Sequence, residues 1–299
     1  MRGPDTQSVL AAQLYPDAKV IARAQYISAS RRTDLPRFFH RQFFNAWRAG
    51  EITYDGGYGR SYTVSLRPEH VLGYIFWSKD YSAFIRQAEL TDLVRQSNAV
   101  FHYTINDFAR LEPHCAPLQT RLSALYALAD MAGPERVFWR FDPVLRYRTQ
   151  SGQVEQTESS FFRLLPQVAK TGITRCYFSF MTLYRKTTRR AVEFLPFSEE
   201  ERADIALRMS EAARDAGMVL CNCCNEDVPR LAPEIEQAHC VDDRILAATD
   251  RFGVHRRLKP APTRDGCGCC ESRDIGSYSP PCPHGCVYCY ANPQTDAAG

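Results

Sequence analysis

Six apolar segments with strand-like composition alternate with helical segments along this chain of 299 residues. The predicted strands are residues 25–30, 72–80, 99–107, 136–144, 174–184 and 218–224. The clearest predicted helix begins after Ser198, a favourable N-cap followed by glutamates, and ends at Gly217. Because buried strands that alternate with helices form parallel βαβ units, we predict an α/β fold. The number of units favours a partial, six-stranded (β/α) barrel of the TIM type.

The rest of the chain divides by composition. We expect residues 1–18 to form a flexible leader, residues 19–251 the barrel domain, and residues 252–299 a cysteine-rich, metal-binding tail that packs on the barrel mouth. Residues 51–70 interrupt the first unit as a predicted β-hairpin or loop. No apolar run reaches the length of a membrane span, and no apolar signal segment begins the chain. These features predict a cytoplasmic protein without a membrane partner.

Cysteine usage indicates metal or redox chemistry. The chain has 12 cysteines, and ten of them lie in its last 80 residues. In a chain without a secretory signal, such clustering favours metal binding over structural disulfides. The stretch "CPHGCVYC" contains Cys282, Cys286 and Cys289 with the spacing C-x3-C-x2-C. Three thiolates can hold a [4Fe–4S] cluster and leave one iron open, whereas a zinc site needs a fourth ligand such as His284 or a remote cysteine.

Four further cysteines, Cys223, Cys240, Cys267 and Cys269, could hold an auxiliary cluster or a zinc ion. Three alternatives are open at this point: two metal centres, one zinc knuckle that the whole tail shares, or buried cysteines without metal. Cys115 and Cys176 lie far from the others in sequence, and we expect them to behave as small apolar residues.

Polar residues gather at the carboxyl ends of the predicted strands. The candidate catalytic residues are Arg31, Arg32, Asp34, Lys79, Arg140 and Asp142. In (β/α) barrels these strand ends build the active site. The arginines could bind a carboxylate or phosphate through forked hydrogen bonds, and the aspartates could orient them or act as bases. The alternative is an Arg–Asp network that only braces the rim.

The segment "CPHGCVYCYAN" resembles the cluster motif C-x-x-G-C-x-Y-C-Y-A of radical-SAM enzymes of the spore-photoproduct-lyase-like kind. In those enzymes the motif follows the first barrel strand, whereas here Cys289 lies 10 residues from the end of the sequence. A tail that folds back over the mouth, in a circularly permuted arrangement, would reconcile the two. The resemblance implies that Cys282, Cys286 and Cys289 bind a [4Fe–4S] cluster and S-adenosylmethionine.

The chain as a whole resembles the uncharacterised domain-of-unknown-function 1848 family, from about residue 20 to residue 293. The motifs that carry this resemblance are "ISASRRTDLP", "FWSKD", "GPERVFWRFDP", "FSFMTLYRKT", "CVDD" and "CGCCESRDIGSYSPPCPHGCVYCYAN". The resemblance implies a cytosolic, barrel-like protein with a cysteine-rich C-terminal region, but no substrate. It also favours Cys223 over Cys221 and Cys224 as the metal ligand of that segment.

These observations predict an iron–sulfur protein, specifically a radical-SAM-like enzyme with an electron donor and a small-molecule cofactor as partners. The alternative is a zinc-stabilised barrel, either a hydrolase or nuclease or a nucleic-acid-binding module, with a structural cysteine tail. No H-E-x-x-H or D-x-D-x-D motif supports a catalytic metal in the first of these. A net charge of +3 gives little support to the second.

Overall fold

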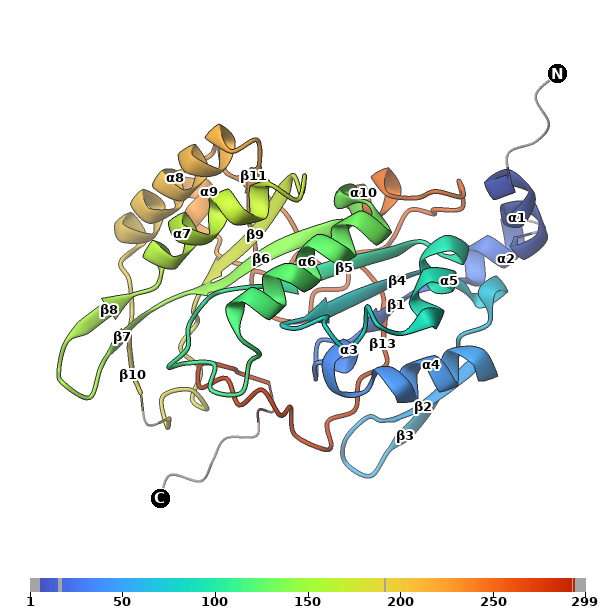
Figure 1. The fold of residues 1–299 in the computed structure, drawn as a ribbon, viewed down its shortest axis with the longest axis horizontal. Coiled ribbons are helices and arrows are strands. Elements are labelled where there is room, and N and C mark those ends of the chain that lie inside the picture. The colour runs from blue at the N-terminus through green and yellow to red at the C-terminus, as the bar shows by residue number, and fades with distance from the viewer. Residues whose placement is uncertain (1–5, 16–17, 191, 292, 294–299) are drawn as a thin grey trace.

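All six predicted strands are present in the computed structural model, which describes residues 6–15, 18–190, 192–291 and 293. They lie side by side in one sheet (Figure 1) as β1 (Gln25–Ala29), β4 (Val71–Ser78), β5 (Ala99–Thr104), β6 (Val137–Val144), β9 (Arg175–Phe180) and β11 (Val219–Asn222). Two short strands that we did not predict, β12 (Glu236–Gln237) and β13 (Arg273–Asp274), extend the sheet. The strand order is β12-β11-β9-β6-β5-β4-β1-β13, and neighbours pair in parallel.

This eight-stranded parallel sheet confirms the α/β fold. Barrel closure is a separate question, because β12 and β13 are the two ends of the ladder and no pairing joins them within the described residues. The partial barrel therefore stays a prediction.

Helices cover one face of the sheet. They are α4 (His40–Ala49), α5 (Ala88–Gln96), α6 (Leu118–Ala132), α7 (Glu158–Ala169) and α8 (Glu199–Asp215), of which α5, α6 and α7 lie in front of the strands in Figure 1. The predicted signals of the last helix are confirmed. Ser198 and Glu201 form a reciprocal capping box, and Gly217 follows the helix with a φ of 75°.

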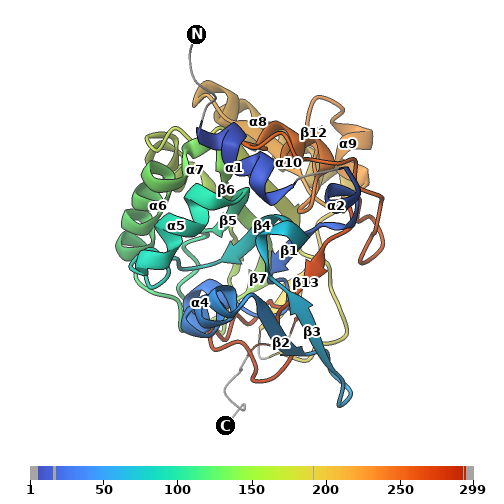
Figure 2. The ribbon, with the colours of Figure 1, turned by 90° about the vertical axis from the view of Figure 1, so that its right-hand side faces the viewer.

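The chain after β12 covers the opposite face (Figure 2). Tyr26, Ile75 and Phe138 from the sheet pack there against Leu246 of α10 (Asp243–Ala248) and Leu258 of the tail. Parallel sheets are apolar on both faces and need cover on both. The tail therefore completes the core, and Cys267, Cys269 and Cys270 of the tail pack in the same cluster.

The remaining elements are peripheral. They are α1 (Thr6–Leu14), α2 (Ala18–Arg23), α3 (Leu35–Phe38), the hairpin β2 (Glu51–Asp55) and β3 (Ser61–Ser65), η1 (Pro68–His70), η2 (Pro134–Arg136), β7 (Arg146–Arg148), β8 (Val154–Gln156), β10 (Glu193–Leu195) and α9 (Asp227–Leu231). The hairpin was one of the two structures predicted for residues 51–70. Within the predicted leader, Ala11 of α1 packs with Phe252 and Val254, while residues 1–5 and 16–17 lie outside the described residues.

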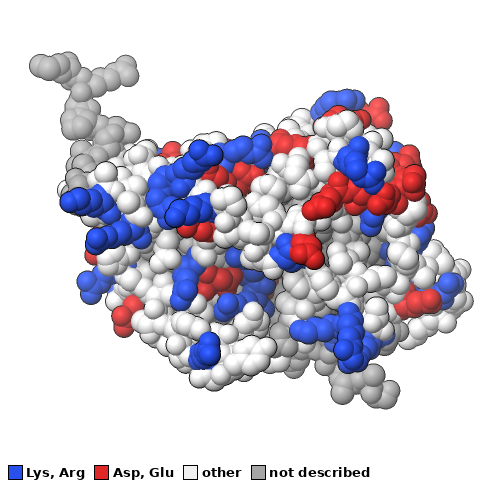
Figure 3. Space-filling view, turned by 180° about the vertical axis from the view of Figure 1, so that it is seen from behind, with Lys and Arg blue, Asp and Glu red and all other residues white. Residues whose placement is uncertain are grey.

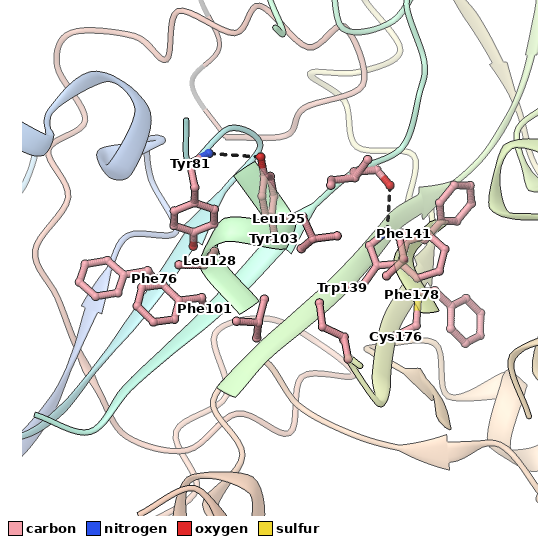
Figure 4. Packing of buried hydrophobic residues seen from close by; sticks show 14 of the residues in the cluster. Phe76, Tyr81, Phe101, Tyr103, Leu125, Leu128, Trp139, Phe141, Cys176 and Phe178 are labelled. Atoms are coloured by element: carbon pink, nitrogen blue, oxygen red, sulfur yellow. Dashed lines mark hydrogen bonds between the residues drawn. The ribbon is translucent and has the colours of Figure 1, made fainter. Parts of the chain in front are cut away.

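Aromatic rings dominate the core between sheet and helices (Figure 4). Trp139 of β6 stacks on Phe161 of α7 with ring centroids 5.1 Å apart, and its indole N–H donates to the carbonyl of Ile105. Phe141 meets Phe161 edge-on. Phe161 is fully buried, whereas its neighbour Phe162 is exposed. The α7–β6 contact therefore depends on one of two adjacent phenylalanines.

We expect Phe161→Ala to lower the free energy of unfolding by about 3–5 kcal/mol, because it leaves a cavity against Trp139 and Phe141. Phe162→Ala is the matched control, with an expected loss below about 1 kcal/mol. Urea denaturation of both variants measures the difference. Equal losses for the two variants would contradict this account of the packing.

Candidate active site

A cavity of about 260 Å³ opens at the carboxyl ends of the parallel strands. The segments after β1, β4, β6 and β9 form part of its wall, and the tail forms the rest. All six predicted catalytic residues line it: Arg31, Arg32, Asp34, Lys79, Arg140 and Asp142. So do Cys282, Cys286 and Cys289 of the tail motif. Strand ends and tail, distant in sequence, therefore share one site.

Asp34 joins three segments of this wall. Its carboxylate accepts hydrogen bonds from the backbone N–H of Lys79 (2.8 Å) and the hydroxyl of Ser78 (2.7 Å). It also caps α3 through the N–H of Arg37 and lies 2.7 Å from Nε2 of His284. Burial is the largest single effect and lowers the pKa of His284, but the hydrogen bonds and charges of Asp34 and Cys115 together outweigh it and raise that pKa to about 10. Asp34 thus anchors the tail as half of a buried ion pair.

Glu112 organises a second buried network beneath the motif. Its Oε1 atom lies 2.7 Å from Nζ of Lys79 and accepts hydrogen bonds from Asn106 (3.0 Å) and the Tyr288 hydroxyl. Burial raises the pKa of Glu112, but the positive charges of Lys79 and Arg121 lower it by a larger amount. The net shift is downward, so the carboxylate is ionised. Because Tyr288 lies between Cys286 and Cys289, this network holds the cysteine loop in place.

Arg140 and Asp142 pair directly on β6. Nη2 of Arg140 lies 2.6 Å from Oδ2 of Asp142, and its Nη1 donates to the sulfur of Cys240 at 3.3 Å. The hydroxyl of Ser179 donates to the other carboxylate oxygen. Arg140 is buried, whereas the Asp142 side chain keeps 24% of its surface exposed. Asp142 is thus the more accessible of the two predicted aspartates, since Asp34 is nearly enclosed.

Arg31 and Arg32 contact the tail through Asp274 of β13. The backbone N–H of Arg31 donates to the Asp274 carboxylate at 2.9 Å, and both guanidinium groups lie within 4 Å of it. Arg32 also donates to the carbonyl of Gly276 and stacks over the ring of Tyr278. Arg31 and Arg32 therefore hold the tail against the rim of the sheet. This is close to the alternative in which these residues form a bracing Arg–Asp network.

The three motif cysteines come from one tight loop. Gly285 has a φ of 64°, a left-handed conformation that glycine adopts without strain, and the N–H of Cys289 donates to the carbonyl of Cys286. Burial raises the pKa of the Cys282 and Cys289 thiols. A bound cationic centre would reverse this effect, because it stabilises thiolate. Loop, burial and a shared cavity wall fit a thiolate-bound group.

The structure brings Cys115 to this loop, which sequence reasoning missed. Its sulfur lies 3.5 Å from Nδ1 of His284 and is hydrogen-bonded to Cys286. We had expected Cys115 to be a plain apolar residue, as Cys176 is in the core. Glu112 was likewise not assigned to the site. Cys115 and Glu112 lie in the loop after β5, whose course the sequence pattern does not define.

The other predicted metal ligands form a second group of cysteines. Cys240 lines the cavity, and its sulfur is 3.6 Å from that of Cys223, which is buried. Cys269 is hydrogen-bonded to Cys240, and Cys267 to Cys269. Cys224, which we had ranked below Cys223, also lines the cavity. Across residues 6–15, 18–190, 192–291 and 293, no three His, Cys, Asp or Glu side chains already surround one point at metal-binding distance.

One face of the molecule carries both basic and acidic side chains. On the face behind the view of Figure 1, Lys and Arg side chains are interspersed with Asp and Glu (Figure 3). Interspersed acidic groups weaken the attraction for a phosphate backbone. In the part of the chain that the structure describes, no helix combines the length and the apolar character that crossing a bilayer requires.

Comparison with known proteins identifies a family but no activity. A family model described as "Domain of unknown function (DUF1848)" matches residues 26–291. No curated protein matches the chain. A solved structure of morphinone reductase in complex with tetrahydroNAD is similar over 68% of this chain, with 15% identity and a TM-score of 0.28. The chain spans half the length of that protein, and so weak a likeness carries no argument.

We expect Glu112→Gln to lower the free energy of unfolding by about 3–5 kcal/mol, because it leaves Lys79 and Arg121 buried without a counter-charge. Glu193→Gln is the control. It removes an exposed ion pair with Arg148, and such pairs contribute at most about 1 kcal/mol. Thermal and urea unfolding compare the variants, and a Glu112→Gln variant as stable as the control would refute the network's role.

Proposed function

We propose a function for this chain from the premise that it belongs to the family described as domain of unknown function (DUF1848), a description that names no reaction. The function is that of an iron–sulfur enzyme of the radical-SAM type. Cys282, Cys286 and Cys289 would hold a [4Fe–4S] cluster. When bound, such a cluster supplies one-electron chemistry toward S-adenosylmethionine at its open iron.

One observation carries this proposal. The three motif cysteines and the six strand-end residues line a single cavity, although more than 100 residues separate the last strand-end aspartate from the first cysteine. A cofactor held by the motif would therefore face the strand-end side chains directly. Buried networks through Asp34 and Glu112 hold the motif loop rigid, and a redox or radical site requires such preorganisation.

Charged side chains of the cavity would bind the cofactor and the substrate. Five arginine and lysine side chains line the cavity, and four of them pair with carboxylates: Arg31 and Arg32 with Asp274, Lys79 with Glu112, and Arg140 with Asp142. The fifth, Arg264, donates to the Tyr184 hydroxyl and is the side chain that we expect to offset the charge of a bound thiolate or of the S-adenosylmethionine carboxylate. Asp142, the more exposed carboxylate, is positioned to orient a substrate or accept a proton from it.

The proposal extends to the fold and the partners. We infer that the parallel sheet curves as a partial barrel whose mouth is this cavity, with the tail folded over it. Radical chemistry would also require an electron-donor protein, and free thiols in this number suit the reducing cytoplasm. The substrate's identity does not follow from these residues.

A zinc-stabilised tail is the second candidate, and Cys115 is the observation that favours it. Cys115 and His284 lie next to Cys286 and could complete a four-ligand zinc site. Such a site would be closed, with no position for a cofactor. The two candidates therefore differ in metal, in ligand number and in the role of Cys115.

Anaerobic purification followed by iron, sulfide and zinc analysis tests the main proposal. We expect about four irons per chain that depend on the motif. The variant Cys282→Ala/Cys286→Ala/Cys289→Ala should lose them, whereas Cys270→Ala, a cysteine of the same tail outside the cavity wall, should retain them. S-adenosylmethionine should also perturb the electron paramagnetic resonance signal of the reduced protein.

Cys115→Ala separates the two candidates. An open cluster keeps its iron in this variant, since Cys115 is not one of its ligands. A closed zinc site would lose zinc instead. A protein that contains zinc but no iron after strictly anaerobic preparation would eliminate the radical-SAM proposal.

A further inference from the structure

Four cysteines from three segments lie next to one another at the cavity, two of them in its wall. Cys223 and Cys224 follow β11, Cys240 follows β12, and Cys269 belongs to the tail. The sulfur of Cys223 lies 3.6 Å from that of Cys224 and 3.6 Å from that of Cys240. Cys240 is in turn hydrogen-bonded to Cys269. We call these four residues the sulfur series.

These distances suit a single ion better than a cluster. Two thiolates bound to one tetrahedral zinc at about 2.3 Å each are separated by about 3.8 Å. The two separations of 3.6 Å in the sulfur series are close to that value. In a [4Fe–4S] cluster each cysteine binds a different iron and points away from the others, so the sulfurs stand farther apart. Two metal-free thiols in van der Waals contact have a similar separation, so these distances do not themselves indicate a metal; they indicate that a metal bound there would be a single ion and not a cluster.

The backbone holds the three segments together independently of the thiols. The N–H of Cys223 donates to the carbonyl of Phe178 in β9. The N–H of Cys270, next to Cys269, donates to the carbonyl of Val241, next to Cys240. The segments that carry the sulfur series are thus fixed by hydrogen bonds beside it, so that few degrees of freedom remain to be ordered when an ion binds.

Two arginines complete the electrostatics. Arg140 donates to the sulfur of Cys240, and Arg264 is hydrogen-bonded to Cys224. Four thiolates around one divalent ion carry two net negative charges, which Arg264 and Arg140, the latter shared with Asp142, offset in part. Burial of such a charged site is costly unless counter-charges of this kind are present.

The ends of the series must move for the shell to close. The described residues contain no ready-made group of three ligands around one point, although Cys223 has two sulfur neighbours at 3.6 Å. Rotation of the Cys224 and Cys269 side chains about their Cα–Cβ bonds would bring the terminal sulfurs toward the central pair. The central pair, Cys223 and Cys240, already has the required separation.

We infer that Cys223, Cys224, Cys240 and Cys269 form a second metal centre that binds one soft divalent ion, with Zn²⁺ as the best match. The site is distinct from the tail motif and does not depend on the proposed iron cluster. It ties the ends of β11 and β12 to the tail, and through Cys224 and Cys240 it faces the cavity. Cys267, which we had grouped with these ligands, lies beside Thr263 and Cys269 at the edge of the series.

The test uses the full chain with the motif removed, so that the two centres are read separately. We expect the Cys282→Ala/Cys286→Ala/Cys289→Ala protein to bind about one zinc per chain, measured by elemental analysis and by competition with a chelator. Adding Cys240→Ala should weaken zinc binding by at least about a hundredfold. Adding Cys221→Ala, a buried cysteine of β11 outside the series, should leave zinc affinity unchanged.

A measurement without further substitution guards against misfolding of the Cys240→Ala protein. In the folded protein, zinc should protect the four cysteines of the series from alkylation, as read by peptide mass spectrometry. Cys270, which lies outside the series, should react equally with and without zinc. Cys221 is buried, so its equal reactivity is checked in a separate sample that is briefly denatured. Co²⁺ in place of zinc should show the charge-transfer absorption of a tetrathiolate site. Absence of zinc binding with no protection, or about four irons retained by the motif-free protein, would overturn the mononuclear site. If the protein with all its cysteines contains no iron, that result contradicts the proposed function but does not affect the second metal centre.

Discussion

The parallel sheet imposes the constraint on which the rest of this structure depends. A strand that is buried on both faces needs cover on both, and the helices supply only one cover. The tail supplies the other, with Leu258 and Cys269 packed against sheet residues such as Tyr26 and Phe138. Because the tail must lie against the sheet, its cysteines are carried to the strand ends. The cavity and its sulfur-rich walls follow from this one packing requirement.

Buried charge then determines how rigid the site is. Lys79 and Glu112, like Asp34 and His284, are enclosed pairs in which each charge would be costly without its partner. Each pair also links a strand end or loop to the tail, so a displacement of the motif loop would break both. The same polar residues that suggest catalysis in the sequence therefore serve partly as anchors. Asp142 retains the exposure that a reacting group requires.

The two sulfur-rich walls differ in chemistry. Cys282, Cys286 and Cys289 come from one short loop and lie among aromatic and cationic groups of the cavity. Cys223, Cys224, Cys240 and Cys269 come from three segments and lie in direct sulfur contact. Proximity of this kind favours a shared single ion, whereas spacing along a loop favours a cluster.

Periodicity and composition alone determined the six long strands, the main helix after Ser198 and the fold class. The six strands and the capped helix after Ser198 could be predicted because burial and capping act locally, within a few residues. The strand-end residues and the motif cysteines could be predicted as cavity residues for the same reason, since strand ends and short cysteine spacings are local signals.

Only the tertiary structure decided which of these residues meet. The contact of Cys115 with Cys286, the burial of Glu112 beneath Tyr288 and the series from Cys224 to Cys269 join segments far apart in the chain. Short strands such as β13 depend on neighbours rather than on their own propensity. Contacts between distant segments are set by packing of the whole sheet and tail, and no local pattern encodes that packing.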